Sequence, residues 1–257
     1  MGATAKTSSV NPLHGVMTSC VCAGALIGAL LGAPAAAQPV AVSVPGTSNP
    51  YLSGMPNGST CCMGDSAPAQ SPVQVTGLTL TPATALTFSA AGGIDFQGNP
   101  PSSGPDGSFI FTTASMNGIS GATWPANTLV GVFLDDSQPD SSPAPADIDF
   151  SSGSGTAFTA LSPALKQVFF IGDGRTGTGF GATQTFVIPA GATRLFLGAS
   201  DGFGWFNNVG SFSVTVSPAQ VGPGAVVAAN VPTLSVPMLV VMSLAVVAGA
   251  LFLRRRS

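Results

Sequence analysis

The stretch that decides the fold is IPAGATRLFLGASDGFGWFNNVGSFSVTVS, which covers Ile188–Ser217. Apolar and polar residues alternate near both of its ends, as where Phe212, Val214 and Val216 are separated by serine and threonine. A period of two is typical of strands with one buried face. Glycines, one aspartate and a pair of asparagines lie between the two alternating runs. The sequence therefore predicts two strands joined by a loop rich in oxygen atoms.

The side chains and carbonyls of this loop are of the kind that bind calcium. Hard oxygen donors suit this cation, and the loop offers one carboxylate, two amides and exposed backbone carbonyls. The candidate donors are Asp201, Asn207, Asn208, Gly202, Gly204 and Trp205. A cation-binding loop is thus a prediction from the residues alone. The alternative is a tight hairpin turn, in which the same side chains accept hydrogen bonds from backbone N–H groups.

The composition predicts an all-β protein. The chain of 257 residues holds 33 Gly and 22 Pro, and only 7% of its residues are charged. Abundant serine, threonine and β-branched residues disfavour long helices and favour short strands joined by turns. We expect a small β-sandwich, with a barrel as the other arrangement that many short strands allow. The predicted strands are Val73–Leu80, Ala85–Ala90, Ser108–Thr113, Thr128–Leu134, Gln167–Ile171, Gln184–Ile188, Arg194–Ala199 and Ser211–Ser217.

The N-terminal residues 1–37 have the pattern of a secretory signal peptide. A weakly basic start is followed by an apolar run and by three alanines before Gln38, which favours cleavage between Ala37 and Gln38. The alternative is an uncleaved anchor. We expect an irregular lead-in over 38–72, rich in Pro, Ser, Gly and Asn, then the β-sandwich over 73–218 and a flexible linker over 219–230.

Residues 231–257 have the pattern of a sorting tail. The apolar run Val236–Leu253 would reach roughly 27 Å as a helix, near the hydrocarbon thickness of a bilayer and barely enough to span it, and Arg254–Arg256 follow it. By the positive-inside rule the arginines stay in the cytoplasm and the body lies outside. The motif before the span is Val231-Pro232-Thr233-Leu234-Ser235. The motif, span and arginine cluster together resemble the PEP-CTERM class of bacterial sorting signals, in its Ile-Pro-Thr-Leu variant.

This resemblance implies a partner and a cell-surface location. A membrane transpeptidase of the exosortase kind would remove the tail and release or re-anchor the protein, often alongside exopolysaccharide production. A permanent membrane anchor is the alternative. After both ends are removed, ten aspartates remain against Lys166, Arg175 and Arg194. Such an acidic body argues against nucleic acid and anionic lipid as partners.

The adjacent cysteines Cys61 and Cys62 leave three interpretations open. Disulfides are permitted in an exported protein, but a bond between neighbouring residues is strained. A link between two copies, a labile switch and two inert thiols are therefore all possible. Zinc is not expected, because the sequence has no CxxC motif and its one histidine, His14, lies in the expected signal peptide.

Two familiar catalytic or cofactor motifs occur in the body, and neither is expected to function. Gly172–Gly177 matches G-x-G-x-x-G, but the residues after it are poor helix formers, and that fingerprint needs a helix to hold a pyrophosphate. Gly198–Gly202 matches G-x-S-x-G, but the body has no histidine for a triad. We expect no enzyme; a hydrolase built on Asp173 or Asp201 is the weakest of the alternatives.

The body between about Thr84 and Val216 resembles the calcium-dependent, galactose-specific bacterial lectins of the PA-I type. The resemblance rests on A-A-G-G-x-x-F at Ala90–Phe96, on Gly104–Gly107, on Leu129–Val132 and on N-N-x-G-S-F-S-V after Asp201. It implies a small β-sandwich in which one calcium bridges the protein to sugar hydroxyls.

Carried over position by position, the resemblance also implies ligands. Asp201, Asn207 and Asn208 would give side-chain oxygens, Phe96 a backbone carbonyl, and Gly204 or Trp205 a second carbonyl. Because calcium takes six to eight oxygens, two sugar hydroxyls can complete its shell. Asp201 and Asn207 would thereby contact the sugar, and the rings of Trp205 and Phe206 can pack on a pyranose.

Two functional hypotheses follow. The first is an exported surface or matrix protein that binds calcium and, through it, carbohydrate, either galactose-like or the cell's own exopolysaccharide. The second is a non-catalytic structural protein of the surface or matrix, in which calcium only stabilises the fold.

Overall fold

The computed structural model describes residues 38–82, 84–151, 155–177 and 179–219. The expected signal peptide over 1–37, most of the expected linker, the expected sorting motif and the apolar run after it fall outside these residues. In the described part the protein is all-β, with fourteen strands and three short 3-10 helices. None of its helices is long and apolar enough to cross a membrane.

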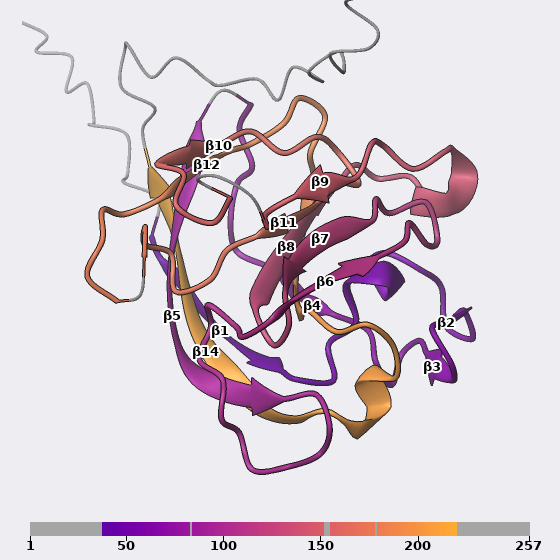
Figure 1. Cartoon of the computed structure of the whole chain (residues 1–257). Coiled ribbons are helices and arrows are strands. Elements are labelled where there is room, and N and C mark those ends of the chain that lie inside the picture. Colours follow the sequence, from indigo (N-terminus) through magenta and orange to yellow (C-terminus); the bar gives the residue numbers. More distant parts are fainter. Residues whose placement is uncertain (1–37, 83, 152–154, 178, 220–257) are drawn as a thin grey trace, which may run out of the picture. The chain divides into compact units, whose positions relative to one another are not determined.

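The larger sheet has five strands and joins segments that are far apart in the sequence. Figure 1 shows β1, β14 and β5 side by side, and β14 pairs with β5 along its whole length in antiparallel register. Phe212, Val214 and Val216 of β14 are buried and Ser211, Ser213 and Thr215 are exposed, as the alternation predicts. The strand order is β1 (Val40–Pro45), β14 (Val209–Ala219), β5 (Ala85–Asp95), β12 (Thr185–Val187) and β10 (Ala160–Leu161).

The second main sheet has four strands and is more deeply buried. All six residues of β8 are buried, because both faces of this strand are covered. Its order is β11 (Val168–Phe170), β8 (Leu129–Leu134), β13 (Arg194–Ala199) and β4 (Val73–Val75). Two small sheets complete the fold: β2 (Thr60–Cys61) with β3 (Asp65–Ser66), and β6 (Ile110–Thr113) with β7 (Ala122–Pro125) and β9 (Ile148–Asp149).

One hydrophobic core is shared by the two main sheets. The rings of Phe169 in β11 and Phe186 in β12 lie 5.6 Å apart, which joins one sheet to the other. Phe186 also meets Phe88 of β5 edge to face at 5.0 Å, and Phe169 stacks on Phe133 of β8 at 5.3 Å. Such ring pairs add to the stabilisation that burial provides. The core therefore holds both sheets, and the loops between them, in fixed positions.

All eight predicted strands overlap an observed strand, and the prediction for Arg194–Ala199 has the observed bounds. The observed β5 and β14 extend beyond their predicted ranges, Ala85–Ala90 and Ser211–Ser217. The expected irregular lead-in over 38–72 is wrong in two places. Val40–Pro45 forms β1, which pairs with β14, and Thr60–Ser66 contains the hairpin of β2 and β3. The helices η1 (Pro50–Leu52), η2 (Pro139–Ser141) and η3 (Trp205–Asn207) are single turns.

Candidate cation site beside an aromatic pocket

The loop over 200–208, called here the cation loop, crosses from one main sheet to the other. It leaves β13 of the four-stranded sheet at Ala199 and enters β14 of the five-stranded sheet at Val209. Its first residue is fixed, since the Ser200 hydroxyl donates to the Pro125 carbonyl at 2.6 Å and accepts from the Thr128 N–H at 2.9 Å. The loop therefore starts from a buried and fully bonded anchor.

Strand pairing brings Phe96 beside the cation loop. Asp95 at the end of β5 pairs with Val209, so the residues that follow β5 lie next to those that precede β14. The turn after Asp95 is held by its carboxylate, which accepts from the N–H groups of Gln97 and Asn99 at 2.9 Å each. The Asn99 bond above all lowers the pKa of Asp95. The sheet register therefore brings Phe96 to the same pocket as Asp201, while its expected role as a carbonyl ligand stays a prediction.

Asp201 has a buried carboxylate, one oxygen of which accepts no hydrogen bond from the described residues. Its side chain is 4% exposed. Its Oδ1 accepts from the N–H of Gly202 at 2.6 Å and from that of Phe203 at 3.4 Å. Its Oδ2 is buried and has no hydrogen-bond partner in the described part of the chain. Burial raises the pKa of Asp201 to about 6, against the two backbone N–H groups that lower it, and the charge of Asp65 adds to the rise.

Asn208 presents a second buried oxygen of the same kind. It is also 4% exposed, and its Nδ2 donates to the Gly46 carbonyl at 3.0 Å. Its Oδ1 is buried without a partner among the described residues. A hydrogen bond of the Asn208 side chain with the Asp201 carboxylate also lowers the pKa of that carboxyl. Two neighbouring side chains, both expected as calcium ligands, therefore each keep an unbonded oxygen, although buried polar atoms are normally bonded.

The oxygen donors of the cation loop suit a hard cation, which they would bind with modest affinity. In the described residues no group of three or more His, Cys, Asp or Glu side chains is placed to hold a metal ion. A site here would rely on one carboxylate, two amides and backbone carbonyls, the ligands that suit calcium. The carbonyls of Gly204 and Trp205 already accept from Asn207 and Asn208 at 3.1 Å, through the turn of η3, but each keeps a second lone pair.

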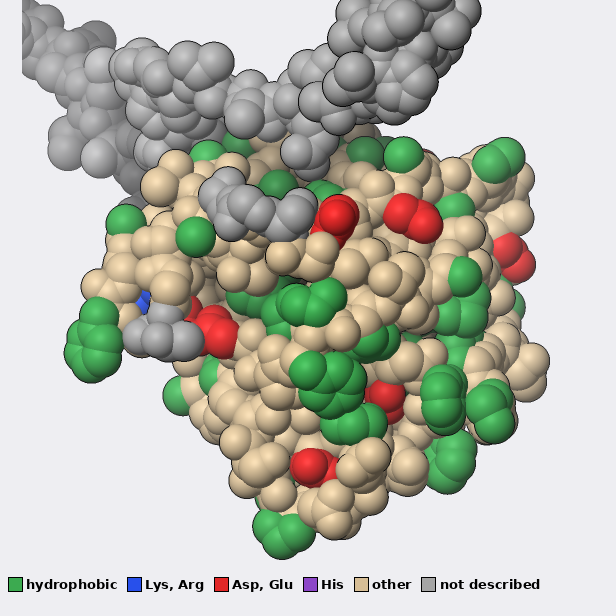
Figure 2. Space-filling view, in the orientation of Figure 1, with side chains coloured by type: hydrophobic (Ala, Val, Ile, Leu, Met, Phe, Trp, Pro, Cys, Tyr) green, Lys and Arg blue, Asp and Glu red, His purple; other side chains and the backbone are tan. Residues whose placement is uncertain are grey.

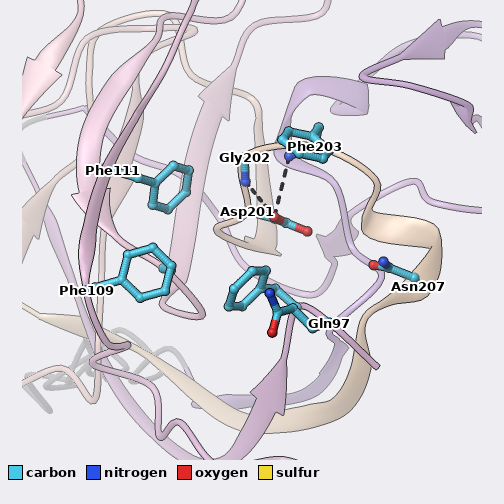
Figure 3. A pocket seen from close by; sticks show the side chains of 9 residues that line it. Gln97, Phe109, Phe111, Asp201, Gly202, Phe203 and Asn207 are labelled. Atoms are coloured by element: carbon cyan, nitrogen blue, oxygen red, sulfur yellow. Dashed lines mark hydrogen bonds between the residues drawn. The ribbon is translucent and has the colours of Figure 1, made fainter. Parts of the chain in front are cut away.

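A pocket of about 390 Å³ opens beside Asp201, and Asn208 lies behind its lining residues. Its wall combines aromatic rings with a few polar groups, and Figure 3 shows Asp201 between the rings of Phe109 and Phe111 and the side chain of Asn207. Phe109 is 56% exposed and Phe203 is 62% exposed, so both rings are open to a ligand. The lining residues are Phe96, Gln97, Phe109, Phe111, Ala126, Asp201, Gly202, Phe203 and Asn207.

Trp205 does not belong to this wall, which corrects the expectation that its ring packs on a sugar. Its side chain is 0% exposed, and its indole N–H donates to the Ala199 carbonyl at 2.8 Å. Its ring lies edge-on to Tyr51, with centroids 5.9 Å apart, inside the core. Phe206 is 56% exposed but does not line the pocket. The rings of Phe96, Phe109, Phe111 and Phe203 take the expected place of Trp205 and Phe206.

Asp65 contacts the cation loop and was not identified from the sequence. It lies in β3, is fully buried, and accepts from the backbone N–H groups of Trp205 at 3.0 Å and Phe206 at 2.9 Å. Burial raises the pKa of Asp65, and these bonds oppose the rise. A lone aspartate in a segment rich in Gly, Ser and Pro gives no signal of this role, because the contact exists only in the folded chain.

The two rejected motifs have structural roles. Ser200 of G-x-S-x-G is buried, and its hydroxyl is engaged in the two bonds that anchor the loop. The G-x-G-x-x-G match at Gly172–Gly177 lies in a turn that continues through a bridge between Arg175 and Thr183 to β12, rather than into a helix. A pyrophosphate would therefore meet no helix N-terminus there.

The charge distribution agrees with the sequence. Figure 2 shows acidic side chains scattered singly between hydrophobic groups, with almost no basic side chain on this face. All ten aspartates lie in the described part of the chain, with three basic residues. Comparisons with family models, with curated proteins and with solved structures give no match for this chain. The function must therefore be argued from the site itself.

Proposed function

We propose that this protein is an exported β-sandwich that binds calcium in the cation loop and, through the calcium, a carbohydrate. The observation that carries the proposal is the pair of unbonded buried oxygens, Oδ2 of Asp201 and Oδ1 of Asn208. An unbonded buried acceptor costs free energy, and a cation between the two would remove that cost. The resemblance to the PA-I type lectins supports the same residues independently.

The affinity for calcium should be low. The site contributes one carboxylate, and the affinity of calcium sites falls as the number of charged ligands falls. We expect a dissociation constant of about 10⁻⁴–10⁻³ M, the range of extracellular calcium modules. Such a site would be filled outside the cell, which is the location that the proposed signal peptide and sorting tail imply.

The pocket beside the cation supports a sugar as the second ligand. A saccharide has hydroxyl groups that can complete the calcium shell and C–H faces that pack on aromatic rings. Gln97 and Asn207 line the pocket and offer amide groups for further hydroxyls. The exopolysaccharide of the producing cell is a candidate, because the tail resembles sorting signals that accompany its production.

Calorimetry on the full chain in mild detergent tests the proposal. We expect calcium to bind to the parent protein and not to the Asp201→Asn variant, while Asp140→Asn, which removes one exposed charge, leaves binding unchanged. A glycan array run with calcium and with chelator then tests the sugar. Equal signals in both conditions, or no calcium binding, would remove the lectin function.

A structural role for calcium, in which the cation only stiffens the loop, is the rival function. Thermal melts separate the two. A ligand raises the melting midpoint only if it binds the native state. If the protein is a lectin, calcium should raise the midpoint and a glycan added afterwards should raise it further. A single rise with calcium, and none with any glycan, would favour the structural protein.

A further inference from the structure

The two adjacent cysteines form a disulfide within one chain. Cys61 and Cys62 are joined at the turn between β2 and β3, which excludes, in this state, both a link between copies and two free thiols. The turn itself is unusual. Cys62 has φ +55° and Met63 has φ +65°, and two successive residues other than glycine rarely adopt this left-handed conformation. The disulfide closes the turn at the first of them.

This hairpin, Thr60–Ser66, grips the cation loop by three successive N–H groups. The Gly204 N–H donates to the Cys62 carbonyl at 3.1 Å. The N–H groups of Trp205 and Phe206 donate to the two carboxylate oxygens of Asp65 at 3.0 and 2.9 Å. Gly204, with φ +77°, is the residue at which η3 begins. The middle of the loop is therefore held in place by the hairpin rather than by the strands that it joins.

The sulfur atoms and the carboxylate of the hairpin share a neighbour. Asn49 Nδ2 donates to Asp65 Oδ2 at 3.1 Å and lies 3.6 Å from Cys62 Sγ. On the other side, Met116 Sδ lies 3.3 Å from Cys62 Sγ. Through Asn49, a change at the disulfide can therefore alter the position of the Asp65 carboxylate, which binds the N–H groups of Trp205 and Phe206.

We propose that the Cys61–Cys62 hairpin positions the cation loop, and that reduction of its disulfide weakens calcium binding there. The second half rests on the proposed function. Both cysteines are partly exposed, so a dithiol reductant can reach them. One thiolate of the reductant attacks a protein sulfur, and its second thiol resolves the mixed disulfide. The protein S–S bond gains two electrons and two protons and becomes two thiols, and the reductant becomes a disulfide.

Calcium titration in the two redox states is the first test. The full chain is used with Cys20 and Cys22 replaced by serine, so that only Cys61 and Cys62 respond to dithiothreitol. We expect the dissociation constant for calcium to rise about fivefold or more on reduction, the lower end of coupling between two sites. A Cys61→Ser, Cys62→Ser variant should match the reduced protein and show no response to dithiothreitol. Equal affinity in both states would overturn the proposal.

Amide hydrogen exchange gives a second test that needs no calcium. Reduction should speed exchange at Gly204, Trp205 and Phe206, whose N–H groups bond the hairpin, and leave the inner amides of β14 unchanged as an internal control. Unchanged exchange at these three residues overturns the positioning role. Faster exchange without any calcium binding would support the positioning role and refute the proposed function, so the two failures are distinguishable.

Discussion

Asp201→Asn should stabilise the calcium-free protein while it removes calcium binding. The parent carboxyl is buried, and this burial raises its pKa from the ordinary 3.8 to about 6. Each pKa unit corresponds to about 1.4 kcal/mol, so at neutral pH the ionised carboxylate costs the folded state at most about 3 kcal/mol. The introduced amide keeps an acceptor for the Gly202 N–H and carries no charge.

The sign of the pH dependence follows from the direction of the pKa change. Because the pKa of Asp201 in the folded state lies above its unfolded value, this group favours folding most below about pH 3.8, and the contribution is lost as the pH rises through about 6. The Asp201→Asn variant has no carboxyl at this position and therefore does not lose this stability as the pH rises. Its stability relative to the parent should therefore increase between about pH 4 and pH 7, by up to about 3 kcal/mol.

Thermal melts with and without calcium measure this effect. For a domain of this size about 3 kcal/mol raises the melting midpoint by roughly 6–12 °C. At neutral pH without calcium the variant should melt above the parent, and calcium should raise only the midpoint of the parent. Asp140→Asn is the matched control, since it removes one exposed carboxylate and should change neither quantity. A variant that melts at or below the parent at neutral pH and still responds to calcium would refute this account of Asp201.

Three further predictions concern the site and its supports. Calcium affinity should fall about tenfold for each pH unit below about 6, because the Asp201 proton must leave before the cation binds; calorimetry at successive pH values checks this, and a flat profile contradicts it. Phe109→Ala should weaken saccharide binding and leave calcium titrations unchanged, whereas Phe180→Ala, at a 99% exposed ring outside the pocket, should do neither; equal losses in both variants would exclude the aromatic wall. Trp205→Ala should lower the free energy of unfolding by about 3–5 kcal/mol, since a buried ring and its bond to Ala199 are lost; urea titration measures it, and a loss below about 1 kcal/mol is inconsistent with a core role.

The fold was predictable where the signal lies within one segment. The middle of β14 alternates between buried and exposed residues, so the period of two identified it, whereas β8 and most of β13 are continuous buried runs. β1 also alternates, but it is short and lies among prolines and serines. Its partner is β14, at the far end of the body, and it is this distant pairing that makes the segment a strand.

The sequence predicted which residue types form the candidate site but not which way their side chains point. The oxygen donors of Asp201 and Asn208 could be named from the sequence, since calcium selects such groups. The sequence could not show which of the two adjacent aromatic residues faces the core. In the structure Trp205 is buried in the core and Phe206 is exposed. Asp65 was missed for a related reason. Its two loop contacts are more than a hundred residues away in sequence, and only the closed hairpin brings them together.

The length of β14 separates the two poles of the molecule. The cation loop lies at its first residue, Val209, and the described chain ends at its last, Ala219. Eleven residues at about 3.3 Å each span roughly 35 Å. The start of β1 lies at the same far pole, because Val40 pairs with Val216. A ligand at the cation loop is therefore separated by the length of one strand from both ends of the described chain.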